Sequence, residues 1–207
     1  MWEKDIEKAK EHFGNIVEGQ IQRLERLKEE TEWIDYTTLD PLVVGVIGGD
    51  GIGPFICKEA ARVLQFLLQD KVEQGKIQFR NIEGLTIENR ARVRQAIPDD
   101  VMEQIKQCHV LLKGPTTTPK KGDKWPNIES ANVSMRRELD LFANLRPVKL
   151  PSENIDWVFF RENTEGAYTL GRHGITVAND DLAFDFAVTT TPGTERIIRL
   201  AFDYAQR

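Results

Sequence analysis

Residues 42–54 read LVVGVIGGDGIGP, an apolar run followed by a glycine loop. The apolar, β-branched run from Leu42 to Ile47 predicts a buried strand, and the helical periodicity of residues 55–69 predicts a helix after it. The loop from Gly48 to Pro54 predicts a tight turn between them, because proline suits the first turn of a helix. The loop differs from the dinucleotide fingerprint GxGxxG, since its third glycine comes one residue early and a proline follows. The segment therefore predicts a strand-turn-helix unit that is not a Rossmann fold, and by itself it predicts no phosphate contact.

The alternation of strands and helices continues along the chain. The sequence predicts strands at residues 76–80 and 109–113, and a helix at residues 98–107 that opens at Pro98. Further on, it predicts helices at residues 130–140 and 191–206 and strand segments at residues 141–146, 156–160 and 175–185. This alternation is typical of an α/β domain with a largely parallel sheet.

The first 35 or so residues differ from the rest in composition. They are rich in Glu, Lys and Arg, and their apolar residues recur at spacings of three and four, which predicts an amphipathic helix. Gly14-Asn15 predicts a break in that helix. Two interpretations stay open: a helix that binds a partner, and a helix that packs on its own domain.

Charge and composition argue against several classes of protein. The net charge of −5 disfavours a nucleic-acid binder, which usually needs a basic face. No apolar run approaches the roughly 18 residues of a membrane span, and the first residues lack a signal-peptide core. We therefore expect a cytoplasmic protein without a nucleic-acid or membrane partner. The histidines lack metal-ligand spacing, and the two cysteines, Cys57 and Cys108, lie in apolar surroundings typical of packing residues.

Three arginines suggest a site that binds carboxylates. Arg136 lies in a predicted helix that begins near Ser130, and Arg146 and Arg161 accompany predicted strands. A helix N-terminus attracts anions, and arginines on rigid elements bind carboxylates through paired hydrogen bonds. The set suits a substrate with two or three carboxylates. The alternative for each arginine alone is a surface salt bridge.

Four motifs in a fixed order carry a family resemblance. They are GDGIGP at residues 49–54, KGPTTTP at 113–119, DLFANLRP at 140–147 and FRENTEG at 160–166. In this order they resemble the motifs of isocitrate and isopropylmalate dehydrogenases, the β-decarboxylating dehydrogenases. The resemblance covers residues 42–207 and implies the first half of that family's α/β fold. We therefore expect a helical extension at residues 1–38, the first part of a large α/β domain at 39–128, and the first part of a small substrate and dimerisation domain at 129–207.

The resemblance also implies roles for individual residues. The expected contacts to substrate carboxylates are Ser130, Asn132, Arg136, Arg146 and Arg161. Tyr168 matches the catalytic tyrosine that protonates the enol after decarboxylation. Thr117 and Thr118 match the loop near the nicotinamide ribose of NAD or NADP, and a site contact for Lys113 stays open.

Ser130 bears on the choice of substrate. Isopropylmalate enzymes of this family have an apolar residue there, whereas a hydroxyl can donate to a third carboxylate. We therefore expect a 2-hydroxy tricarboxylate, isocitrate, oxidised to 2-oxoglutarate and CO2 as in the tricarboxylic acid cycle. Homoisocitrate, isopropylmalate and a tartrate-like acid are the alternatives.

The resemblance implies that part of the machinery lies beyond Arg207. In the family, a lysine and the aspartates that hold Mg2+ or Mn2+ come later in the sequence, so we expect no metal ligand in this chain. We expect the chain to be inactive alone, to associate with a complementary C-terminal chain, and to dimerise. A noncatalytic regulatory subunit and a truncated fragment are the competing interpretations.

Overall fold

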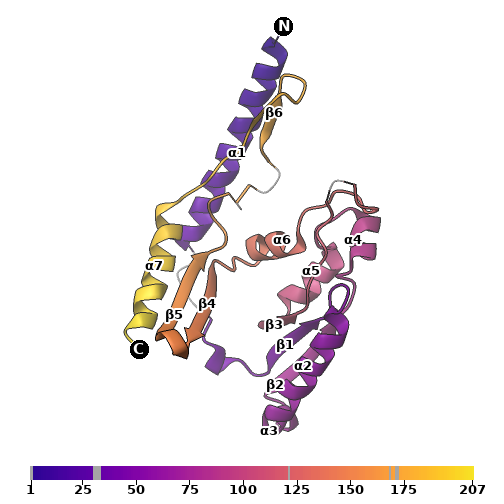
Figure 1. Cartoon of the computed structure of the whole chain (residues 1–207), viewed down its shortest axis with the longest axis vertical. Coiled ribbons are helices and arrows are strands. Elements are labelled where there is room, and N and C mark those ends of the chain that lie inside the picture. Colours follow the sequence, from indigo (N-terminus) through magenta and orange to yellow (C-terminus); the bar gives the residue numbers. More distant parts are fainter. Residues whose placement is uncertain (1, 30–33, 121, 168, 171–172) are drawn as a thin grey trace. The chain divides into compact units, whose positions relative to one another are not determined.

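The computed structural model describes residues 2–29, 34–120, 122–167, 169–170 and 173–207 (Figure 1). The chain forms two compact units. We call residues Trp33–Met135 the sheet unit, and residues Met1–Glu32 together with Arg136–Arg207 the ribbon unit. The domain boundaries expected after residues 38 and 128 refer to domains of the complete family fold, not to these two units. They stay a prediction.

The sheet unit contains a parallel three-stranded sheet of order β2-β1-β3. Its strands are β1 (Leu42–Ile47), β2 (Ile77–Ile82) and β3 (Val110–Lys113). Its helices are α2 (Gly53–Leu67), α3 (Gln69–Glu73), α4 (Ile87–Val93) and α5 (Asp99–Lys106), after a short 3-10 turn at Tyr36–Thr38. The predicted parallel α/β arrangement is confirmed, while α3 and α4 were not predicted because both are short.

The glycine loop after β1 is shaped by close packing against the loop after β3. Gly49 has a φ of +72°, and a Cβ there would lie 2.1 Å from the carbonyl oxygen of Pro115. A Cβ on Gly53 or on Gly114 would lie 2.1 Å from the carbonyl oxygen of Gly48. These contacts require glycine because no side chain fits between the two backbones.

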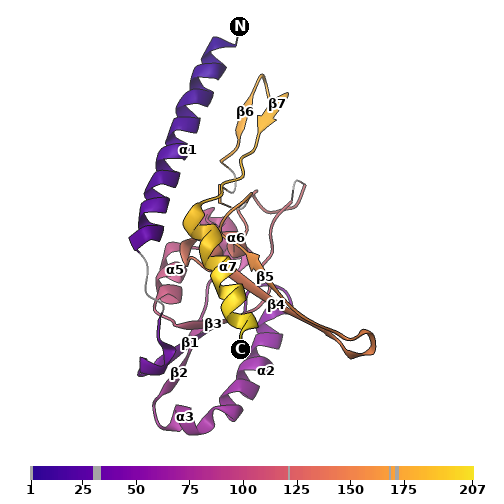
Figure 2. The same ribbon diagram turned by 90° about the vertical axis from the view of Figure 1, so that its left-hand side faces the viewer.

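Among its described residues, the ribbon unit contains two antiparallel two-stranded ribbons (Figure 2). The first ribbon pairs β4 (Ala143–Leu150) with β5 (Ile155–Glu162) through a 3-10 turn at Pro151–Glu153. The second pairs β6 (Ile175–Val177) with β7 (Leu182–Phe184). The strand character predicted over residues 175–185 is present as these two strands, which are separate because Ala178, Asn179 and Asp180 adopt positive φ angles and turn the chain back.

Helix α1 (Glu3–Glu29) is continuous, so the predicted break at Gly14-Asn15 is wrong. A glycine in a helix interior costs only about 1 kcal/mol, and tertiary contacts offset that cost. Phe13 of α1 packs on Phe186 with ring centroids 5.5 Å apart, and α1 also contacts β6 and α7 (Thr191–Ala205). Of the two interpretations left open, the structure shows the helix packed on its own unit.

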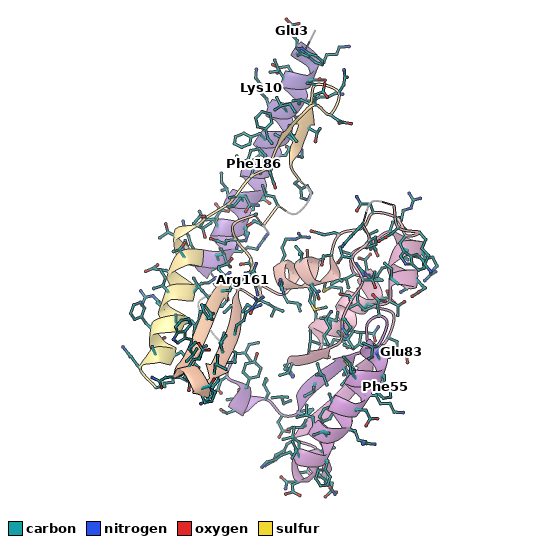
Figure 3. All side chains as sticks on the ribbon, viewed as in Figure 1. Glu3, Lys10, Phe55, Glu83, Arg161 and Phe186 are labelled. Atoms are coloured by element: carbon teal, nitrogen blue, oxygen red, sulfur yellow. The ribbon has the colours of Figure 1, made fainter. Side chains whose placement is uncertain are left out.

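Large apolar side chains remain exposed on both units. On α2, Phe55 (Figure 3), Phe66 and Leu67 are 68%, 74% and 70% exposed. In the part of the chain that the structure describes, β2 and β3 each pair with β1 only. Helices long and apolar enough to cross a bilayer are absent from the described residues.

Candidate functional site

Asp50 of the glycine loop holds two loops of the sheet unit together. Its carboxylate is buried and accepts hydrogen bonds from the backbone N–H groups of Ile87 at 2.7 Å and Thr117 at 2.6 Å. The Asp50 N–H donates to the carbonyl oxygen of Pro115 at 2.8 Å. The glycine loop therefore fixes the backbone of the predicted cofactor loop.

Arg90 of α4 is fully buried and makes three further links in the same unit. Its guanidinium donates to the carbonyl oxygens of Ala96 at 2.7 Å, Thr117 at 2.7 Å and Glu129 at 2.9 Å. Burial lowers the pKa of Arg90, and the negative charge of Asp50 opposes that shift. The group stays a cation, because arginine is not deprotonated in proteins. Sequence reasoning missed Arg90, since nothing local separates it from its neighbours in the run NRARVRQ.

The links made by Arg90 place several predicted site residues at the end of the sheet unit. Thr117 and Thr118 have their backbone in the fixed loop and their side chains exposed. Ser130 follows Glu129 and directly precedes α6 (Ala131–Glu138), where its carbonyl accepts from Ser134 N–H at 3.0 Å. The Oγ1 of Thr116 lies 3.5 Å from the Oδ1 of Asn132, which connects this loop to α6.

Lys113 at the end of β3 turns toward its own loop. Its Nζ donates to the carbonyl oxygen of Gly114 at 2.8 Å and to the Oγ1 of Thr116 at 3.3 Å. The structure therefore gives Lys113 a role in shaping the loop, and a contact to substrate stays a prediction.

Two of the three predicted arginines lie together on the β4–β5 ribbon. The strands pair Asn144 with Arg161 and Arg146 with Phe159. Because side chains alternate across a strand, Arg146 and Arg161 share one face as diagonal neighbours. The Nε of Arg146 donates to the Oδ1 of Asn144 at 2.9 Å, and Arg161 is half-buried near the end of β5 (Figure 3).

The other predicted residues fall in α6 and beyond β5. Arg136 is half-buried in the last turn of α6, and its carbonyl accepts from Leu141 N–H at 2.8 Å. Asn132 and Arg136 are four residues apart in this helix, so they project from one face. Tyr168 lies outside the residues that the structure describes.

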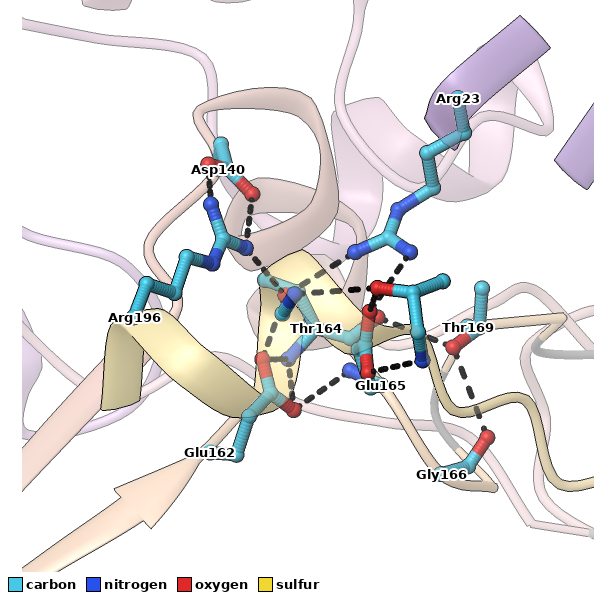
Figure 4. Close-up of polar contacts among 10 residues, drawn as sticks. Arg23, Asp140, Glu162, Thr164, Glu165, Gly166, Thr169 and Arg196 are labelled. Atoms are coloured by element: carbon cyan, nitrogen blue, oxygen red, sulfur yellow. Dashed lines mark hydrogen bonds and ion pairs between the residues drawn. The ribbon is translucent and has the colours of Figure 1, made fainter. Parts of the chain in front are cut away.

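Directly after Arg161 the chain forms a buried polar turn, shown in Figure 4. The carboxylate of Glu162 accepts from the N–H and hydroxyl of Thr164, the latter at 2.6 Å, and from the N–H of Glu165 at 2.5 Å. The carboxylate of Glu165 accepts from the N–H of Thr190 at 2.9 Å and from its hydroxyl at 2.5 Å. Residues 162–165 are thus held at the N-terminus of α7, where the helix dipole favours a negative charge.

Arg196 of α7 binds the other side of this turn (Figure 4). Its guanidinium makes a two-nitrogen ion pair with Asp140 and donates to the Oγ1 of Thr164 at 3.0 Å. The group also lies 4.2 Å from the centroid of the Phe142 ring, a cation–π contact. Sequence reasoning missed Arg196 because the residues that it binds lie 32 and 56 positions away.

A substitution at Gly193 can test how tightly this turn is packed. A Cβ at Gly193 would lie 2.1 Å from the Oε1 of Glu165. Gly193→Ala is therefore expected to lower the free energy of unfolding by about 1–3 kcal/mol, the usual cost of overpacking, as measured by urea denaturation. Gly14→Ala is the matched control, because nothing lies within 4 Å of a Cβ there. That variant is expected to be neutral or stabilising, and equal losses from both variants would contradict the packing of Gly193 on Glu165.

Comparisons with known proteins show which family this chain is similar to. The family model described as isocitrate/isopropylmalate dehydrogenase matches residues 43–207. A homoisocitrate dehydrogenase of Methanocaldococcus jannaschii is 34% identical, with 78% of this chain and 48% of that protein covered. An NADP isocitrate dehydrogenase of Caldococcus noboribetus is 33% identical, with 92% and 48% covered. Subunit 2 of the mitochondrial NAD isocitrate dehydrogenase of Schizosaccharomyces pombe is 34% identical, with 79% and 41% covered.

One solved structure has a similar fold. The TT0538 protein from Thermus thermophilus superposes with a TM-score of 0.57 at 28% identity, covering 79% of this chain and 32% of that one. The chain spans about half the length, or less, of the relatives it matches.

Proposed function

Because this chain belongs to the isocitrate/isopropylmalate dehydrogenase family, we propose that it supplies the substrate-binding part of an NAD(P)-dependent isocitrate dehydrogenase. The observation that carries the proposal is the shared face of Arg146 and Arg161 on the β4–β5 ribbon. Two neighbouring guanidinium groups on rigid strands suit a substrate with several carboxylates, because each can bind a carboxylate through two parallel hydrogen bonds.

The start of α6 supplies the proposed preference for isocitrate. Ser130 precedes the first residue of the helix, where unpaired N–H groups and the helix dipole favour an anion. Its hydroxyl can donate to a third carboxylate, which isopropylmalate lacks. Asn132 and Arg136, on one face of the same helix, are proposed to contact the same substrate.

Thr117 and Thr118 suit a nicotinamide cofactor, NAD or NADP. Their side chains are exposed on a loop whose backbone is fixed by Asp50 and Arg90. Their hydroxyls can hydrogen-bond to a ribose, and the cofactor would supply the hydride acceptor. We assign Tyr168 the proton transfer to the enol that follows loss of CO2.

The metal ion of the reaction is proposed to be Mg2+ or Mn2+, bound outside this chain. Within the described ranges, His, Cys, Asp and Glu form no group of three or more that could hold a metal ion. We therefore assign no step of the reaction to a metal on these residues.

The exposed apolar surface of α2 and the open strands of the sheet fit a complementary C-terminal segment. Phe55, Phe66 and Leu67 on α2 would be buried by the rest of the family fold, since large interfaces of this kind are apolar. We propose that the working enzyme contains that segment, dimerises and acts in the cytoplasm. This chain together with that segment is called the assembled enzyme.

The proposal is tested by the substrate range of the assembled enzyme. We expect kcat/KM for isocitrate to exceed that for homoisocitrate and isopropylmalate, measured by reduction of NAD or NADP. Ser130→Leu should lower kcat/KM for isocitrate about 10- to 100-fold, the usual value of a hydrogen bond to a charged group. Ser130→Thr, which keeps the hydroxyl, is the control.

The other outcomes of this assay separate the alternatives. Higher kcat/KM for isopropylmalate or homoisocitrate would overturn the substrate assignment. Homoisocitrate belongs in the assay because one relative is named for it. Binding of isocitrate without turnover would favour a regulatory subunit.

A further inference from the structure

Arg23 connects the N-terminal helix to the turn that follows Arg161. It lies on α1, and its side chain is only 14% exposed. Its Nη1 donates to the Oε1 of Glu165 at 3.1 Å, and its Nη2 lies 3.4 Å from the Oγ1 of Thr164 (Figure 4). These residues are more than 140 positions apart in the sequence, so the contact fixes α1 against a distant segment.

Among the residues that the structure describes, Arg23 is the cation that pairs with the carboxylate of Glu165. The side chain of Glu165 is 6% exposed, and the N–H and hydroxyl that Thr190 donates to it are neutral. A buried carboxylate without a cation is costly even when it accepts hydrogen bonds. Loss of Arg23 would therefore favour a movement of Glu165 toward water.

A movement of Glu165 would carry the neighbouring site residues with it. Glu165 is four residues after Arg161 and three before Tyr168, and the turn between them is tied together by Glu162. Thr169 is also linked to this turn, because its hydroxyl donates to the carbonyl oxygen of Thr164 at 3.0 Å. The position of the whole segment thus depends on the contacts of Thr164 and Glu165.

We propose that Arg23 is a positioning residue of the substrate site, acting by holding Thr164 and Glu165 so that Arg161 keeps its orientation. The N-terminal helix, which lies outside the residues that the family model matches, is then a functional part of this protein. This inference rests on the proposed function, since Arg161 is its proposed substrate contact.

The test compares Arg23→Gln with Arg23→Lys and with Arg26→Gln in the assembled enzyme. Arg23→Gln is expected to raise KM for isocitrate about tenfold while kcat stays within about threefold. It is also expected to speed amide hydrogen exchange in residues 163–167 and 169–170. Arg23→Lys should recover part of both effects, because it keeps the charge beside Glu165. Arg26 is exposed on the same helix, so Arg26→Gln should match the unmodified enzyme.

Three results would overturn the positioning role. They are an unchanged KM for Arg23→Gln, a loss of kcat alone, and faster exchange spread over the whole ribbon unit, since the last two indicate a loss of folded enzyme. If the unmodified enzyme does not oxidise isocitrate, the proposed function fails by itself. In that case local exchange in residues 163–167 and 169–170 still decides whether Arg23 holds the turn.

Discussion

Replacing Tyr168 with phenylalanine is expected to lower kcat of the assembled enzyme by about 10²–10⁴, the usual loss when a general acid is removed. Phenylalanine keeps the ring and removes only the hydroxyl that is proposed to give a proton to the enol. Steady-state kinetics with isocitrate should therefore show KM within a few-fold of the unmodified value.

Arg136→Ala gives the contrasting result for a binding residue. Loss of a charge-assisted hydrogen bond to a carboxylate should raise KM with a smaller change in kcat. The two variants together separate proton transfer from substrate binding. An unchanged kcat in Tyr168→Phe would show that the family's role for this tyrosine does not apply here.

Replacing Arg90 with methionine is expected to lower the free energy of unfolding by at least about 3 kcal/mol, because each buried polar group left without a partner costs roughly 1–3 kcal/mol. Methionine fills much of the same space but leaves the carbonyl oxygens of Ala96, Thr117 and Glu129 without their donor. It also removes the cation that lies near the buried Asp50. Urea denaturation followed by circular dichroism measures the change.

Arg92→Met is the matched control for Arg90. Arg92 is on the same helix and exposed, and its guanidinium donates to the side chain of Asn89. Its loss should change stability by no more than about 0.5 kcal/mol. Equal effects of the two substitutions would mean that the three carbonyl contacts of Arg90 contribute little.

The sequence predicted best those elements whose signals are local. β1 has the predicted bounds, Leu42–Ile47, because a continuous β-branched run allows little else. Helix α7 begins at the predicted residue, Thr191, next to a proline in its first turn. The turn inside residues 175–185 was not predicted, because it uses Ala178 at positive φ, a residue type with no preference for that conformation.

Among the proposed site residues, the arginines and the threonine loop are predictions that come from the ordered motifs of the sequence. The four ordered motifs also predicted the family, and the alternation of strands and helices predicted the parallel α/β arrangement, because both signals lie in short stretches of sequence. Only the tertiary structure showed that Arg23 and Arg90 hold loops in place while Arg146 and Arg161 share one face of the β4–β5 ribbon. An arginine's role depends on its burial and its partners, and contacts between residues far apart in the chain determine both.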